Sequence, residues 1–225
     1  MYKALAIDSS SNCITFAACN GDKEVSVSLD IGMRQSEKLL ITIQYVLEQI
    51  EITPSELDFT VLCEGPGAFT GLRLAFAAFK ALELAHGCPI YAIPTLDAIA
   101  YPYAALNGAV LSVLDAKKSR FYASLYRNGN QEIAPLDASP EDILALLDIE
   151  ETILVVGPDS ELFVEKARAI RPTQDLRILQ PVQKNTSFAL LALGKQKHEK
   201  KADPLKDYDG PVYIRKSEAE ENLQA

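Results

Sequence analysis

The pattern of apolar and polar positions predicts strands and helices in a definite order along the first half of the chain. Three short apolar segments come first, and Asn20-Gly21 between the second and the third favours a two-residue hairpin turn. Apolar residues then recur twice at helical spacing, before and after another apolar segment. The pattern predicts strands at 3–7, 13–18, 25–29, 59–63 and 90–92, with helices at about 36–50 and 72–86.

Capping residues mark the ends of these two helices. Ser36 is the expected N-cap of the first helix, and Gly87 follows the second helix as a C-cap glycine does. Each helix has an apolar face that can cover a sheet. The core-facing residues are Leu39, Ile43, Val46, Leu47 and Ile50 on the first helix and Leu72, Ala75, Phe79 and Leu82 on the second.

The second half of the chain repeats the turn and strand-end residues of the first half in the same order. Asp115 closes an opening strand as Asp8 does. Asn128-Gly129 is a second hairpin pair, and Gly157-Pro158 is a second Gly-Pro pair after a strand. Ser139, which precedes a proline, is the expected N-cap of a helix in this half. The predicted strands lie at 109–114, at 121–126, near 133 and at 153–156.

This correspondence predicts a duplicated βββαβα unit. The order resembles that of the actin, hexokinase and heat-shock-chaperone ATPase superfamily, which has the ribonuclease-H-like fold. We therefore expect an α/β protein with two such domains, each a mixed central sheet flanked by helices. The N-terminal domain is expected at 1–103 and a smaller C-terminal domain at 104–225, and the tail from about residue 211 is a candidate to pack back on the N-terminal domain.

Size and charge indicate a globular protein that does not hold nucleic acid alone. The chain has 225 residues, of which 48% are hydrophobic, and its net charge is −9. Phosphate binding needs clustered Lys and Arg, and the basic run at 195–201 is explained by a helix C-terminus, with a peripheral RNA contact as the alternative. Asp8 interrupts the first apolar segment too early for a membrane span, so we expect a cytoplasmic protein. The four cysteines lack C-x-x-C spacing and are expected to be reduced.

A glycine-rich turn separates the fourth predicted strand from the second helix. Successive N–H groups before a helix can cradle an anion, but glycine also allows tight packing between strand and helix. Active ATPases of the superfamily carry Asp-x-Gly after the first strand of each half, whereas Ser10 and Lys117 stand at the glycine positions here. The turn is therefore expected to set the angle at which the second helix leaves the sheet. Its residues are Gly65, Pro66, Gly67, Thr70 and Gly71.

Catalytic and metal-binding motifs are not found in the sequence. The two histidines, His86 and His198, do not form an H-x-x-x-H pair, and no serine lies in a G-x-S-x-G context. We therefore predict no catalytic residue, no bound cofactor and no metal ion in this chain.

Apolar residues also interrupt the polar faces of the two N-terminal helices. On the first helix these are Ile41 and Tyr45, and on the second helix Phe76 and Leu84 stand among charged residues. Two helices with the same anomaly predict a shared docking surface for another protein. The predicted partner-binding residues are Ile41, Tyr45, Arg73, Phe76, Lys80 and Leu84.

Several segments together resemble the TsaB family of bacterial tRNA threonylcarbamoyladenosine biosynthesis proteins. The family pattern G-P-G-S-F-T-G-L-R is met from Gly65 to Arg73, with Ala68 in place of serine. Other similar segments are 5–10, 34–40, 95–100, 114–116 and 211–215, and the resemblance extends from residue 3 to about residue 220. One departure is Gln35, where the family usually has histidine.

The resemblance implies a noncatalytic scaffold of the complex that modifies adenosine 37 of tRNA. Members of the TsaB family pair through their N-terminal helices with the catalytic protein TsaD, which carries metal-binding histidines, and the ATPase TsaE joins the pair. ATP and a metal ion are therefore expected in the partner proteins, and tRNA only indirectly through the complex. Homodimerisation of the chain when alone is left open.

Two other functions stay open at this point. One is a self-contained ATP-binding kinase or ATPase of the same superfamily, which titration with ATP and magnesium would test. The other is a peptidase that acts on a partner protein, although no activated nucleophile is recognisable in the sequence.

Overall fold

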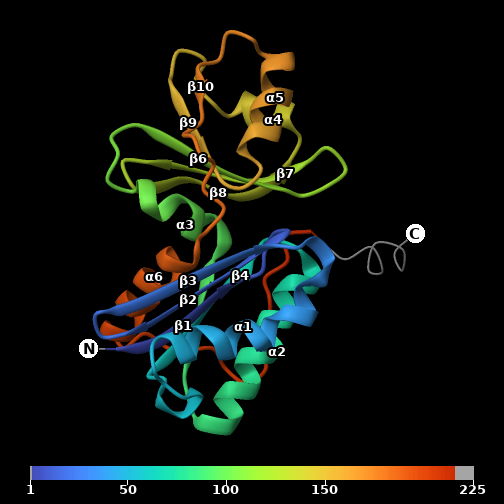
Figure 1. Ribbon diagram of the computed structural model, residues 1–225. Coiled ribbons are helices and arrows are strands. Elements are labelled where there is room, and N and C mark those ends of the chain that lie inside the picture. Colours follow the sequence, from blue (N-terminus) through green and yellow to red (C-terminus); the bar gives the residue numbers. More distant parts are fainter. Residues whose placement is uncertain (1, 216–225) are drawn as a thin grey trace. The chain divides into compact units, whose positions relative to one another are not determined.

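The computed structural model describes residues 2–215 and divides into two compact units. Unit 1 joins the residues up to Pro102 with Lys184–Pro211, and unit 2 consists of Tyr103–Gln183 together with the described residues from Val212. Each unit contains a five-stranded mixed sheet with helices packed on it (Figure 1).

The sheet of unit 1 combines a three-stranded meander with two parallel strands. The meander is β1 (Lys3–Asp8), β2 (Cys13–Asn20) and β3 (Lys23–Asp30), and β4 (Phe59–Gly65) and β5 (Ile90–Pro94) continue the sheet beyond β1. The strand order is β3-β2-β1-β4-β5. Strands β1 and β4 are buried on both faces, which explains their continuous apolar sequences.

Helices cover both faces of this sheet. Leu5 of β1 shares a core with α1 (Gln35–Gln49) and α2 (Phe69–His86), whereas its neighbour Ala4 shares a second core with α6 (Ser187–Glu199). Successive strand residues point to opposite faces, so one strand supplies both cores. The short elements of this part of the chain are α3 (Thr95–Ala100) and the 3-10 turns η1 (Gly32–Arg34), η2 (Pro54–Glu56) and η3 (Tyr101–Tyr103).

Helix α6 comes from late in the sequence and yet belongs to unit 1. Its Leu190 is fully buried on the sheet, and a Cβ at Gly194 would lie 2.2 Å from Cγ2 of Val61 in β4. The α6 backbone therefore approaches the sheet more closely than a side chain at that position allows.

This division of the chain differs from the predicted domains at 1–103 and 104–225. The reason is that the apolar face of α6 completes the second core of unit 1, so the C-terminal part of the chain is not one continuous domain. The predicted tail from about residue 211 is also divided: Val212 to Arg215 count with unit 2, and residues 216–225 lie outside the described part.

The sheet of unit 2 repeats the topology of the first sheet. Its meander is β6 (Ala109–Asp115), β7 (Phe121–Arg127) and β8 (Asn130–Ala138), and β9 (Ile153–Val156) and β10 (Leu176–Arg177) are parallel to β6. The order β10-β9-β6-β7-β8 is that of unit 1 read from the opposite edge. The duplication predicted from the sequence is therefore confirmed at the level of strand order.

Two helices share a core with this second sheet. They are α4 (Pro140–Ala145) and α5 (Ser160–Ile170). Phe163 of α5 meets Phe121 of β7 edge to face, with 5.2 Å between ring centroids. Ser139 is the N-cap of α4, as predicted, because its Oγ accepts a backbone N–H from the first turn.

Several predicted boundaries shift in the structure. Helix α1 begins at Gln35, so Ser36 lies inside the helix and is not its N-cap, because η1 leads directly into α1. Helix α2 begins at Phe69 rather than at residue 72, which places Thr70 and Gly71 in its first turn. The strand expected near residue 133 is the nine-residue β8. Gly87 ends α2 with a left-handed φ of 70°, as a C-cap glycine does.

All four cysteines are free, and three of them are buried. Within residues 2–215, no helix has the length and apolar character needed to cross a bilayer.

Replacing Gly194 by valine is expected to destabilise the protein by about 1–3 kcal/mol, because overpacking forces stiff neighbours such as Val61 to shift. Thermal unfolding followed by circular dichroism measures this. Gly210→Val is the matched control, since nothing lies within 4 Å of a Cβ there. Equal melting temperatures for the Gly194 variant and the parent chain would show that α6 is not in tight contact.

Candidate functional site

The glycine turn between β4 and α2 packs directly on the loop between β1 and β2. A Cβ at Gly67 would lie 2.6 Å from Cβ of Ser10, and a Cβ at Gly71 would lie 2.0 Å from the carbonyl oxygen of Ser9. The N–H of Ala68 donates to the Ser10 carbonyl at 2.7 Å, and Ser9 Oγ donates to the Gly71 carbonyl at 2.8 Å. These glycines allow two backbone segments to touch, so the structure favours the packing role of the turn.

The start of the turn needs glycine for a different reason. Gly65 has a φ of 117°, a conformation that residues with a Cβ rarely adopt. Gly65 is the last residue of β4, and Pro66 follows it before α2 begins at Phe69. The sharp change of direction between strand and helix is therefore encoded in the turn itself.

Asp8, at the end of β1, is buried and engaged by protein groups. The N–H of Ser10 donates to Asp8 Oδ1 at 2.8 Å, and the Thr186 hydroxyl donates to Asp8 Oδ2. Ser10 is thus held over the carboxylate at a position where active superfamily members need glycine. Asp8 acts here as the acceptor that shapes the loop.

The two histidines have separate surroundings. His86 is exposed at the end of α2. His198 stacks on Phe59 with 4.7 Å between ring centroids, and its Nδ1 lies 3.3 Å from Tyr91 Oη. In the described part of the chain, no three His, Cys, Asp or Glu residues lie where they could hold a metal ion together.

Four of the six predicted partner-binding residues are exposed, and the other two are buried or half-buried. Ile41 is 65% exposed, Tyr45 is 47% exposed and Leu84 is 90% exposed. Ile41 and Tyr45 lie one helical turn apart on α1 and therefore form a continuous apolar strip. Arg73 is exposed, and its guanidinium lies 3.9 Å from the centroid of the Phe69 ring.

The prediction for Phe76 is wrong. Phe76 is only 5% exposed and belongs to the core beneath α1 and α2. It stands four residues after Leu72 and three before Phe79, so helical spacing already places it on the buried stripe. Lys80 is half-buried and tied down, because its Nζ contacts Glu83 at 3.0 Å and the Lys206 carbonyl at 2.7 Å.

Two further exposed apolar residues lie outside the predicted set. Leu40 of α1 is 69% exposed, and Phe69, at the start of α2, is 40% exposed. Leu40 directly precedes Ile41 on the outer face, which is the signal that could have identified it. We refer to Leu40, Ile41, Tyr45, Phe69 and Leu84 as the α1–α2 apolar surface.

A hollow of about 200 Å³ lies at the start of the two helices. Gln35 of α1 and Phe69 of α2 both line it. Gln35 is buried, and its Nε2 donates to the Ser11 carbonyl at 2.6 Å, so the residue that replaces the family histidine ties α1 to the β1–β2 loop. Gln35 is thus a structural anchor in this chain.

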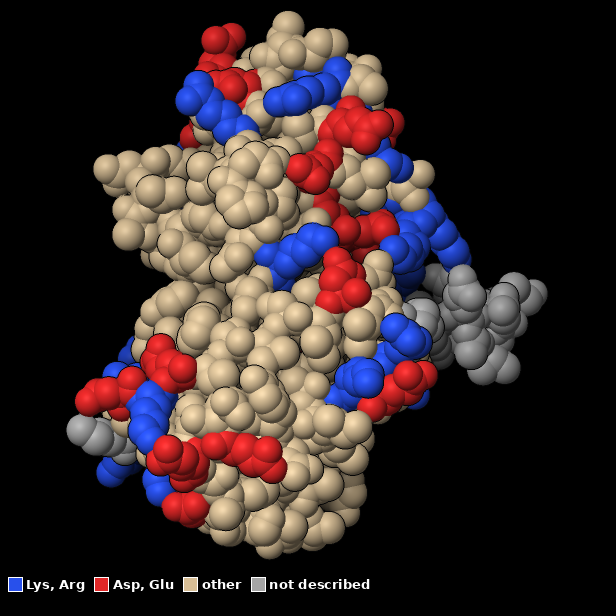
Figure 2. Space-filling view, in the orientation of Figure 1, with Lys and Arg blue, Asp and Glu red and all other residues tan. Residues whose placement is uncertain are grey.

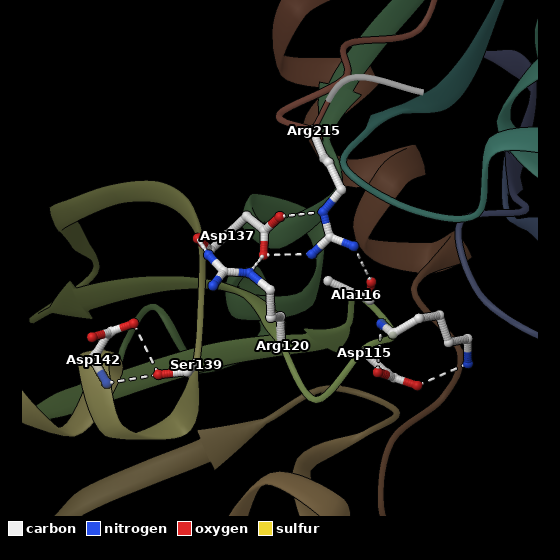
Figure 3. A network of polar contacts seen from close by, with 8 residues as sticks. Asp115, Ala116, Arg120, Asp137, Ser139, Asp142 and Arg215 are labelled. Carbon is white, nitrogen blue, oxygen red and sulfur yellow. Dashed lines mark hydrogen bonds and ion pairs between the residues drawn. The ribbon is translucent and has the colours of Figure 1, made fainter. Parts of the chain in front are cut away.

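In unit 2, the segment around Arg215 is held by an ion-pair network (Figure 3). Arg215 donates to both Asp137 oxygens, at 2.6 and 2.8 Å, and to the Ala116 carbonyl at 2.8 Å. Arg120 Nε donates to Asp137 Oδ1 at 2.8 Å. Burial raises the pKa of Asp137, but the two guanidinium groups outweigh it and hold that pKa below its ordinary value.

Asp137→Asn is expected to lower the free energy of unfolding at pH 7 by about 2 kcal/mol, because two arginines lose a charged acceptor. Since the folded-state pKa of Asp137 is depressed, its contribution is present above the unfolded-state pKa and is lost as pH falls through the folded-state value. Urea unfolding at pH 7 and at acid pH measures both effects.

The control for Asp137 is Asp175→Asn, which breaks an exposed pair with Arg177 and should cost less than about 1 kcal/mol. If both variants lose the same stability at pH 7, the network around Asp137 has no special role.

Charge on the drawn face of the molecule is mixed. Asp and Glu stand among Lys and Arg, and the view contains no broad basic area (Figure 2). This agrees with the net charge of −9 and gives no support for nucleic-acid binding over this face as a whole.

Comparison with known proteins identifies relatives over nearly the whole chain. A family model described as "TsaD: tRNA N6-adenosine threonylcarbamoyltransferase" matches residues 32–205, more than half of the chain. The tRNA threonylcarbamoyladenosine biosynthesis protein TsaB of Bacillus subtilis (strain 168) is 26% identical over 223 residues, which is 96% of this chain and 95% of that protein.

Solved structures show the same fold. A Pseudomonas aeruginosa protein described by its similarity to peptidase YEAZ has a TM-score of 0.80 at 22% identity, covering 96% of this chain and 100% of that chain. A Bacteroides thetaiotaomicron protein with an actin-like ATPase fold has a TM-score of 0.50 at 12% identity, covering 85% and 96%. The expected α/β fold with two mixed sheets flanked by helices is thereby confirmed.

Proposed function

We propose that this chain, which belongs to the family of TsaD: tRNA N6-adenosine threonylcarbamoyltransferase, acts in the formation of threonylcarbamoyladenosine on tRNA. The name of the Bacillus subtilis relative supports this role, because the similarity covers 96% of the present chain. The specific role that we propose is that of a noncatalytic subunit, equivalent to TsaB.

The contacts of the first loop support a noncatalytic subunit. Ser10 and Thr186 each donate a hydrogen bond to the Asp8 carboxylate, and a Cβ at Gly67 would lie 2.6 Å from Cβ of Ser10, so the two segments are in contact. A nucleotide phosphate would have to displace these groups to reach the backbone at the end of β1. A self-contained ATPase is the less favoured function for this reason.

The α1–α2 apolar surface is the observation that carries the proposal of a partner. Leu84 is 90% exposed, Leu40 is 69% exposed and Ile41 is 65% exposed, although the core beneath these helices is complete without them. Large apolar side chains that a monomer leaves in water are typical of interaction sites. A TsaD-type subunit is the proposed partner, because it shares the family of this chain and so offers helices of the same type.

The proposed assembly also contains a second partner protein and the tRNA. A TsaE-type ATPase joins the pair, ATP and a metal ion are held by the partner subunits, and tRNA is bound by the complex. Self-association through the α1–α2 apolar surface is the expected competitor when the TsaD-type partner is missing. The cytoplasmic location expected from the sequence stays a prediction of this role.

The double variant Ile41→Asp/Tyr45→Asp is expected to raise the Kd for the TsaD-type partner at least about tenfold, because desolvating two unpaired carboxylates opposes association. Binding is measured by calorimetric titration of the purified full chains, and folding by circular dichroism. Phe76 is unsuitable for this test because it is buried in the core.

Leu146→Asp is the control. Leu146 is 54% exposed and lies on unit 2, and its replacement by aspartate also places a carboxylate on an exposed apolar site. The interface proposal fails if the double variant binds the partner as tightly as the parent chain does, or if the Leu146 variant loses as much affinity.

Titration of the isolated chain with ATP and magnesium is expected to show no turnover, because the Asp8 carboxylate is already engaged by the Ser10 N–H and the Thr186 hydroxyl. Phosphate release measures this, and the complete complex with the TsaD-type and TsaE-type subunits is the positive control. Stoichiometric binding with turnover by the isolated chain would instead establish the kinase or ATPase function.

A further inference from the structure

The hairpin between β6 and β7 has an unusual backbone. Lys117, Lys118 and Ser119 have φ values of 62°, 51° and 57°, so three consecutive residues with a Cβ lie in the left-handed region. Glycine would adopt this conformation at lower cost. Non-glycine residues held in such a conformation are concentrated at functional sites, which directs attention to the side chains of this hairpin.

Local contacts hold the hairpin in this shape. Ala116 N–H donates to the Arg120 carbonyl, and Arg120 N–H donates to the Lys117 carbonyl, both at 3.0 Å. Asp115 Oδ1 accepts the N–H of Lys117 at 2.8 Å. Arg120, at the end of the same loop, donates to Asp137, which Arg215 also contacts (Figure 3). This network holds the backbone of the hairpin in place.

The outer surface of the hairpin is basic. The Lys117 side chain is 72% exposed, Lys118 is exposed, and Lys166 of α5 reaches Ser119 Oγ at 3.3 Å. The carboxylates of this region are less exposed than the lysines: Asp137 is shared by two arginines, and Asp159 accepts the N–H of Asp115 at 2.8 Å. Asp115, whose side chain is 18% exposed, pairs through Oδ2 with Lys117 Nζ at 2.8 Å. Among the groups connected by these contacts, cations outnumber carboxylates.

We propose that the outer side of the β6–β7 hairpin contacts the phosphodiester backbone of RNA through Lys117 and Lys118, with Lys166 beside them. This inference rests on the proposed function, in which the RNA is the tRNA being modified. It assigns to the chain a contact in the loaded complex that is separate from the α1–α2 apolar surface.

The geometry favours a polyanion over a single phosphate ion. A small anion needs a concave set of free N–H groups, but the Lys117 N–H is taken by Asp115, whose carboxylate would also repel an anion at the backbone. The exposed lysines of the turn, of which Lys117 would exchange its Asp115 partner for a phosphate, instead suit an extended backbone with many phosphate positions. Each contact adds affinity without reading sequence.

The experiment compares two lysine pairs in the complex of the full chain with its TsaD-type partner. Lys117→Asn/Lys118→Asn removes the hairpin charges with a residue that tolerates left-handed φ. Lys23→Asn/Lys206→Asn is the control, because it also removes two exposed lysines and lies outside both the hairpin and the basic run at 195–201. Fluorescence anisotropy of labelled tRNA is measured over a salt series.

The hairpin variant is expected to bind tRNA more weakly and to reduce the slope of log affinity against log salt by about one to two, whereas the control pair keeps the parent slope. Unchanged affinity and slope for the hairpin variant would overturn the proposal, as would an equal loss in both variants. Partner binding is measured separately by co-elution, so a failure of the subunit pairing is recognised as such. In that case the same comparison is made with the isolated chain at low salt, where equal tRNA binding by the parent and the hairpin variant would overturn the hairpin contact.

Discussion

The contact between the glycine turn and the β1–β2 loop is the constraint on which the placement of the helices depends. Gly67 and Gly71 meet Ser10 and Ser9 so closely that no side chain fits between them. The contact fixes where α2 leaves the sheet, and Gln35 attaches α1 to the same loop through the Ser11 carbonyl. The positions of both helices in unit 1 therefore depend on one small set of backbone contacts.

The same contact is the basis of our proposal that this chain does not hold a nucleotide by itself. Where a phosphate would approach the end of β1, the loop carries serines, and the Ser10 N–H and the hydroxyl of Thr186, just before α6, donate to Asp8. A loop whose polar groups bond to other protein groups can fix where the helices begin, but it offers few free donors to a phosphate. The duplicated fold is similar to an actin-like ATPase fold, and the surfaces that we propose for interaction lie on α1 and α2 and on the hairpin of unit 2.

The sequence predicts the parts of this arrangement that follow from local periodicity and turn chemistry. Strand order, the Gly87 and Ser139 caps and the exposure of Ile41, Tyr45 and Leu84 are of this kind. The prediction misplaces Phe76, although its spacing from Leu72 and Phe79 marks the buried stripe. Other features depend on distant partners: periodicity does not say that α6 covers the sheet of unit 1, and it gives no sign of left-handed lysines at 117 and 118.

In the role that we propose, this chain supports the modification of tRNA without performing the chemistry. Reconstitution with purified TsaD-type and TsaE-type subunits, the threonylcarbamoyl donor and unmodified tRNA tests it most directly, with threonylcarbamoyladenosine quantified by mass spectrometry of the digested tRNA. We predict that product forms when this chain is added and falls to background when it is omitted, and that the chain alone forms none. Equal product with and without the chain, or product from the chain alone, would contradict the claim.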